Sequence, residues 1–100
     1  MAAPPFRILT APEFDKQLTQ VAKSNTAKHR KVLKAIRMLR DIGPRHPGLN
    51  AHKYRTLTGP NGEDIWEVYV ENSTPGAWRL WWCYGPESDT ITLVTVGPHP

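Results

Sequence analysis

The hydrophobic period of the chain changes once, and this change most limits the folds that it can adopt. Apolar residues first repeat at helical spacing in two stretches: Phe14, Leu18, Val21 and Ala22, then Val32, Leu33, Ile36 and Leu39. From about residue 52 onward, apolar and polar residues alternate in short segments between turns rich in Gly, Pro, Asn and Ser. The sequence therefore predicts two helices followed by a meander of strands.

Cap and turn residues set the bounds of these elements. Thr10 with Glu13 three residues later predicts a capping box at the start of the first helix. Ser24-Asn25-Thr26 offers an N-cap for the second helix, which we expect to end at Gly43 before Pro44. The predicted strands are residues 6–9, 53–58, 65–71, 78–84 and 90–96, which gives the order β-α-α-β-β-β-β.

This order predicts an α+β fold, in one domain that spans residues 1–100. A hundred residues suffice for one hydrophobic core and not for two domains. Because both helices are amphipathic, we expect a helical hairpin that packs on one face of a mostly antiparallel, curved sheet. Alternation in the strands then places Val68, Leu80 and Trp82 toward the helices and Glu67 and Arg79 on the other, open face, where we expect the site.

The charge of the chain is concentrated in its first half. Twelve of the thirteen Lys and Arg residues, but only three of the nine acids, precede residue 56, so this half has a net charge of +9. Residues 56–100 hold one Arg and six acids, for a net charge of −5. A basic half of this kind indicates a polyanionic partner such as a nucleic acid, and the alternative is a solvated basic helix that keeps the protein soluble.

The cysteine count, the N-terminus and the lengths of the apolar stretches all suit a cytoplasmic protein. Cys83 is the only cysteine, so no internal disulfide can form, as suits a reducing compartment. The N-terminus lacks the pattern of a signal peptide, and no apolar stretch approaches the roughly 18 residues of a membrane span. We therefore expect a cytoplasmic protein with no membrane partner. No cluster has metal-ligand spacing, so no metal or other cofactor is expected.

Four short motifs resemble the RelE/ParE toxin superfamily in their order and spacing. The first is Phe6-Arg7-Ile8-Leu9 with Glu13-Phe14, and the second is Leu57-Thr58-Gly59 followed by Ile65-Trp66-Glu67-Val68-Tyr69. The third is Trp78-Arg79-Leu80-Trp81-Trp82, and the last is a C-terminal tail that carries His99. The resemblance covers essentially the whole chain and implies a RelE-like fold.

The same resemblance implies three functions. The first is a ribosome-dependent endonuclease that cuts mRNA in the A site of the small ribosomal subunit and is held inactive by a cognate antitoxin. The second is a ParE-like inhibitor of DNA gyrase, and the third is a non-catalytic family member that acts as a binding module. Since His52 and His99 suit RNA cleavage, the nuclease is the expectation, with the 2′-OH as nucleophile and no metal.

Arg79 and His99 are the first candidates for this chemistry. Arg79 is the only Lys or Arg after residue 55, and its fork of N–H groups suits a phosphate in the transition state. The alternative is a structural ion pair with Glu67 on the neighbouring strand. His99 suits a general acid or base because imidazole titrates near neutral pH, and the alternative is a frayed terminal residue.

The remaining candidates each keep two roles. Glu67 is either a general base or the group that orients Arg79. Lys53, with His52 and Arg55, either contacts phosphate and assists proton transfer or simply protects an edge strand by charge. Trp81 is a stacking platform for RNA bases only if it is exposed. The basic residues expected to contact RNA or the ribosome from the second helix are Lys28, Lys31, Lys34 and Arg37.

Overall fold

The elements of the fold follow the order that the sequence predicts. The computed structural model describes residues 5–72 and 74–99. It contains β1 (Arg7–Thr10), α1 (Pro12–Ser24), α2 (Thr26–Asp41), the 3-10 turn η1 (Pro47–Leu49), β2 (His52–Thr58), β3 (Asp64–Tyr69), β4 (Trp78–Tyr84) and β5 (Thr90–Pro98). The α+β class is confirmed. No helix in the described part of the chain is long and apolar enough to cross a membrane.

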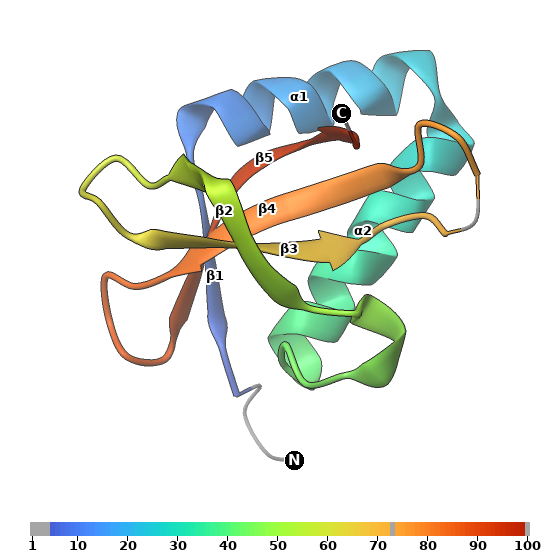
Figure 1. Cartoon of the computed structure of the whole chain (residues 1–100). Coiled ribbons are helices and arrows are strands. Elements are labelled where there is room, and N and C mark those ends of the chain that lie inside the picture. The colour runs from blue at the N-terminus through green and yellow to red at the C-terminus, as the bar shows by residue number, and fades with distance from the viewer. Residues whose placement is uncertain (1–4, 73, 100) are drawn as a thin grey trace.

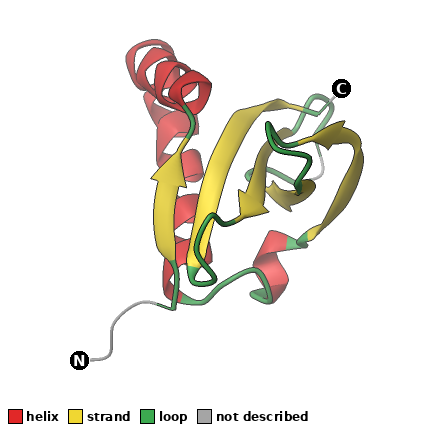
Figure 2. Ribbon diagram, turned by 90° about the vertical axis from the view of Figure 1, so that its left-hand side faces the viewer, coloured by secondary structure: helices red, strands yellow, loops and turns green. Residues whose placement is uncertain are grey.

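The five strands form one mixed sheet in the order β1-β5-β4-β3-β2. Strand β1 runs parallel to β5, and the other pairs are antiparallel. Figure 1 shows α2 behind the sheet and α1 along its upper edge, and Figure 2 shows both helices on one side of it. The sheet therefore has a helix-covered face and an outer face, which is the face turned away from α1 and α2.

The hydrophobic core lies between the helices and the covered face of the sheet. Fully buried side chains of the helices meet fully buried side chains of the strands there: Phe14, Val32 and Leu39 with Val68, Leu80, Trp82 and Leu93. The alternation in β3 and β4 thus points the predicted residues inward, and it leaves Glu67 and Arg79 on the outer face.

The predicted ends of α2 are confirmed, and the predicted capping box of α1 is wrong. The side chain of Asn25 accepts a hydrogen bond from the Lys28 N–H at 3.0 Å. Gly43, with a φ of +103°, donates its N–H to the Met38 carbonyl. Ala11, not Thr10, is the N-cap of α1, and no side chain caps that end. Thr10 instead belongs to β1, where it pairs with Leu93. Because it is part of the sheet, it does not act as the N-cap of the helix.

One partly buried carboxylate ties α2 to the sheet just beyond β3. Glu71 accepts hydrogen bonds from Lys28 Nζ at 2.6 Å, from Lys31 Nζ at 3.0 Å and from the Trp78 N–H at 3.2 Å. The Lys28 hydrogen bond makes the largest contribution to lowering the pKa of Glu71 from 4.5 to about 2. Glu71 thereby holds α2, the end of β3 and the start of β4 together.

We expect Glu71→Gln to remove a pH-dependent part of the stability. A lowered pKa stabilises the folded state above the unfolded-state pKa of 4.5, and this contribution is lost as the pH falls from about 4.5 toward about 2. The loss at pH 7 should be about 1–2 kcal/mol, because Lys31 is half exposed and solvent screens part of the interaction. Urea unfolding followed by tryptophan fluorescence, repeated from pH 7 to pH 2, measures it.

The matched control is Glu87→Gln. Glu87 is exposed in the turn before β5 and forms no ion pair within the described residues. Its variant should follow the wild-type pH curve. Parallel curves for Glu71→Gln and wild type would show that the ion pairs of Glu71 do not stabilise the fold.

Candidate active site

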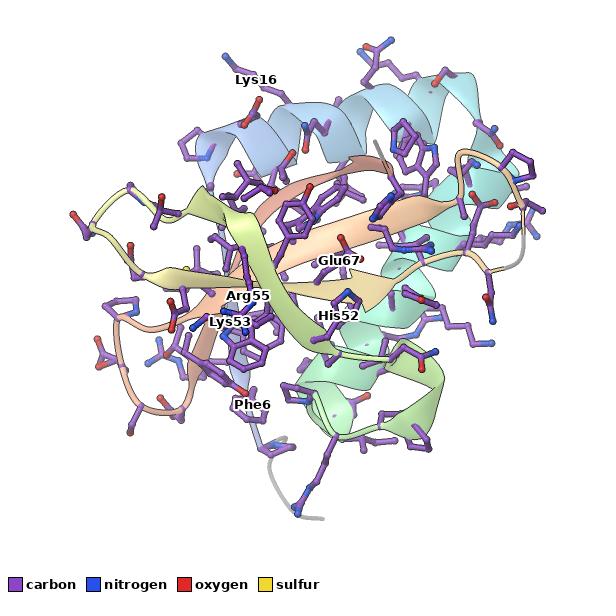
Figure 3. The ribbon with its side chains drawn as sticks, in the orientation of Figure 1. Phe6, Lys16, His52, Lys53, Arg55 and Glu67 are labelled. Atoms are coloured by element: carbon purple, nitrogen blue, oxygen red, sulfur yellow. The ribbon has the colours of Figure 1, made fainter. Side chains whose placement is uncertain are left out.

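Three candidate functional side chains and one indole meet around a buried carboxylate on the outer face. They are His52, Arg79, His99 and Trp81, and the carboxylate is Glu67. Glu67 is only 1% exposed. Its Oε1 lies 3.0 Å from His52 Nε2 and 3.6 Å from Arg79 Nε. Its Oε2 accepts a hydrogen bond from Trp81 Nε1 at 2.9 Å and lies 3.7 Å from His99 Nε2. We call His52, Glu67, Arg79 and His99 the Glu67 cluster; Figure 3 shows two of its members, His52 and Glu67, next to each other.

The register of the sheet brings these residues together. His52 of β2 lies directly opposite Glu67 of β3, and Glu67 lies opposite Trp81 of β4. Arg79 lies two residues before Trp81 and therefore on the same face. His99 follows the end of β5 and donates its backbone N–H to the Ala77 carbonyl at 2.9 Å. The alternative of a frayed His99 is therefore wrong.

Arg79 is held in place from several sides. Its Nη1 donates to the Glu71 carbonyl at 2.6 Å and to the Trp78 carbonyl at 3.1 Å. Its guanidinium stacks 3.8 Å from the centre of the Tyr69 ring. The side chain is 12% exposed, and within the described residues no hydrogen bond engages Nη2. The predicted pairing with Glu67 is present, and Nη2 remains for a ligand.

His52 is placed by two acceptors. Its Nδ1 lies 2.7 Å from the Asn50 carbonyl, and its Nε2 lies 3.0 Å from Glu67. A neutral imidazole has one N–H and can donate to only one of them, whereas the protonated ring donates to both. The edge of the ring also meets Tyr69, with centroids 6.2 Å apart. Half of the side chain is exposed, so a substrate can reach it.

Lys53 and Arg55 do not join the Glu67 cluster. Lys53 lies opposite Trp66, so its side chain points to the other face from His52, and its Nζ lies 3.2 Å from Asp64 Oδ2. Arg55 is exposed on the same strand. The expectation of a catalytic Lys53 fails because adjacent residues of a strand point to opposite faces. The alternative role, charge on an edge strand, fits the placement of both residues.

The stacking role expected for Trp81 is also wrong. Trp81 is 5% exposed and packs in a small cluster on the outer face with Ile65 and Cys83. The ring of Tyr54 covers it at a centroid distance of 5.7 Å. The outer face is therefore partly covered by its own edge strand. Trp81 serves the site by donating its indole N–H to Glu67.

The four α2 residues that the sequence predicts to contact RNA divide into two pairs. Lys28 and Lys31 are bound to Glu71, and Lys28 also lies 5.1 Å above the Trp78 ring. Lys34 and Arg37 are exposed, and neither forms an ion pair within the described part of the chain. Of these four residues, only Lys34 and Arg37 are without an ion-paired acidic partner within the described residues.

Sequence reasoning missed the supporting roles of Tyr69 and Glu71. Tyr69 and Glu71 lie two and four residues after Glu67, so alternation along the strand predicts that they share its face. This alternation is the one sequence signal that could have placed them beside Arg79. No group of three His, Cys, Asp or Glu side chains among the described residues is arranged to hold a metal ion. Burial raises the pKa of the Cys83 thiol, which disfavours a nucleophilic thiolate there.

The site can supply one guanidinium and two imidazoles to a ligand on the outer face. The guanidinium can stabilise negative charge on a phosphate, and the imidazoles can remove and deliver protons. Glu67 is buried and faces four N–H donors, so it is placed to orient these groups and not to meet a substrate. Of its two predicted roles, the geometry favours the orienting one.

No protein-family model matches the chain, and neither does any curated protein. Solved structures do match it over nearly its whole length. The YoeB dimer of Staphylococcus aureus has a TM-score of 0.70 at 12% identity and covers 96% of this chain and 99% of that one. RelE in the RelE–RelB complex of Pyrococcus horikoshii OT3 has a TM-score of 0.66 at 15% identity and covers 94% of each chain.

A third match is a metal-bound toxin from Helicobacter pylori, with a TM-score of 0.60 at 23% identity over 94% of each chain. These proteins share a fold with this chain although few residues are identical. The resemblance that the sequence motifs indicate is therefore confirmed at the level of structure: the chain has the fold of the RelE/ParE toxin superfamily.

Proposed function

We propose that the chain is the toxin of a type II toxin–antitoxin pair and an endoribonuclease that cuts mRNA on the ribosome in the cytoplasm. The observation that carries this proposal is the Glu67 cluster, which gathers one guanidinium and two imidazoles on the face that the helices leave uncovered. Metal-independent RNA cleavage needs these groups: a base, an acid and a positive charge at the phosphate.

In the proposed reaction, the 2′-OH of the RNA attacks the adjacent phosphate. His99 removes the proton from the 2′-OH as the new O–P bond forms. Arg79 Nη2 stabilises the negative charge that develops on the phosphorane. Protonated His52 donates a proton to the 5′-oxygen as the P–O bond to it breaks. The products are a 2′,3′-cyclic phosphate and a free 5′-OH.

The orientation of both imidazoles by one carboxylate supports this division of roles. His52 lies between two acceptors, the Asn50 carbonyl and Glu67, which hold its ring in one orientation. His99 lies 3.7 Å from the other oxygen of Glu67 and is 45% exposed, so it can reach a substrate hydroxyl. The two oxygens of Glu67 thus face different imidazoles, Oε1 facing His52 and Oε2 facing His99.

Two further observations support the expected partners. RelE and YoeB, which share the fold, were solved in complexes named RelE–RelB and YoeB–YefM. We infer that an antitoxin also binds this chain, and that an acidic segment of it faces the basic first half. The exposed Lys34 and Arg37 on α2 suit contacts with RNA or the ribosome, which set affinity and not cleavage.

Arg79→Ala and His99→Ala should each lower cleavage of translated mRNA by about 100-fold or more. The variants lose charge at the phosphorane or the proton acceptor, so induced expression should no longer arrest growth. Mapped 5′ ends of cellular mRNA, with and without a translation inhibitor, measure cleavage. Lys23→Ala is the control, since Lys23 is an exposed cation at the end of α1 and outside the Glu67 cluster.

Full toxicity of both variants would place the active site elsewhere. Trapped DNA gyrase in a supercoiling assay would instead identify a ParE-like toxin. A wild-type chain without toxicity or cleavage would identify a binding module.

Glu67→Gln should lower kcat by about 10- to 100-fold and leave KM nearly unchanged. The amide keeps the size of the side chain, but it provides one acceptor oxygen for the several donors that face the carboxylate. Single-turnover cleavage on programmed ribosomes separates the two parameters. Wild-type kcat in this variant would show that the carboxylate does not orient the site.

A further inference from the structure

A cleft lies beside the Glu67 cluster, between α2 and the end of β3. Its volume is about 340 Å³, which lies within the range of small-ligand sites. Residues of three different segments line it, among them Lys31 and Lys34 of α2, Gly48 of η1, and Tyr69, Asn72 and Thr74 at the end of β3 and beyond. None of these residues belongs to the Glu67 cluster.

Tyr69 forms a wall that the cleft and the Glu67 cluster share. Its ring carries the Arg79 guanidinium at 3.8 Å and meets the edge of His52. The neighbouring Glu71 also belongs to both, because its side chain lines the cleft while its carbonyl binds Arg79 Nη1 at 2.6 Å. A strand whose phosphate lies at Arg79 therefore reaches the cleft by passing Tyr69.

The charges around the cleft favour an anion. Glu71, its only carboxylate, is bound to both Lys28 and Lys31. Lys34 makes no ion pair with any residue in the described ranges, so the cleft has a net positive charge. The hydroxyls of Tyr69 and Thr74 add donors of the kind that phosphate oxygens accept.

We propose that this cleft binds the phosphodiester group of a nucleotide that flanks the cleaved bond, with Lys34 as its principal cation. This inference rests on the proposed function, since it assigns a second contact to the same RNA strand. Lys34 then fixes the register of the strand and lowers KM, whereas the Glu67 cluster sets kcat.

Binding of a short single-stranded RNA to the isolated full chain tests the cleft. The probe is a fluorescent pentaribonucleotide with a 2′-deoxy sugar at the cleavage position, measured by anisotropy at several salt concentrations. Lys34→Ala should weaken binding roughly three- to tenfold and reduce the salt slope by about 0.7, the value for one contact on a single strand. Lys34→Arg should retain wild-type affinity.

Lys23→Ala is the matched control, because it also removes one exposed lysine but does not line the cleft. Its affinity should equal that of wild type. Equal affinities and slopes for Lys34→Ala and Lys23→Ala, or no RNA binding by wild type, would overturn the proposal. In cleavage of translated mRNA, Lys34→Ala should raise KM and leave kcat unchanged, and a loss confined to kcat would also overturn it.

The outcomes separate this inference from the proposed function. If Arg79→Ala abolishes cleavage while Lys34→Ala binds RNA like its control, the nuclease assignment holds and the cleft has another role. If wild type cleaves no RNA but Lys34→Ala binds the RNA probe more weakly than Lys23→Ala does, the cleft binds RNA and the nuclease assignment fails.

Discussion

The arrangement of the outer face depends on the burial of one carboxylate, Glu67. A buried charge is costly unless donors compensate it, and Glu67 is 1% exposed in a sheet whose covered face is apolar. Trp81 of β4 donates a hydrogen bond to Glu67 and His52 of β2 lies at 3.0 Å, while Arg79 of β4 and His99 face it at the longer distances of 3.6 and 3.7 Å. A shift of any of these strands by one residue would move its donor to the other face. The charge of Glu67 therefore links strand register to the assembly of the site.

Alternation along the strands predicted the centre of this site but not its surroundings. It placed Glu67 and Arg79 on one face, and their ion pair is present. Spacing alone could not show that Tyr54 covers Trp81, because that contact depends on how β2 lies over its neighbours. The family resemblance implies a basic residue of the site at Lys53, although strand geometry turns its side chain away from that of His52. In β2, as in β3 and β4, alternation predicts that neighbouring side chains such as those of His52 and Lys53 point to opposite faces.

Local signals predicted helix ends only where no strand competed for the same residue. Asn25 and Gly43 lie between or after helices, and their backbone groups have no partner in a sheet, so capping chemistry decides their conformation. Thr10 has the same local signal but adjoins a strand that pairs with β5. Several ladder hydrogen bonds outweigh one side-chain cap, whose worth is about 1 kcal/mol. The fold class was predictable because the hydrophobic period extends over many residues, whereas a cap signal was reliable only where no strand competed for its residue.

The pairing of Arg79 with Glu67 also explains why binding and chemistry need separate cations. A guanidinium 3.6 Å from a carboxylate contributes little net charge at long range, and the second half of the chain is acidic overall. A phosphate approaching this pair is attracted strongly only at short range, through Nη2 and a protonated imidazole. Long-range attraction must therefore come from cations without an acidic partner, and α2 presents Lys34 in the cleft beside the site and Arg37 on its exposed surface. The basic first half of the sequence thus supplies the long-range attraction that the sheet, with its Arg79–Glu67 pair, does not.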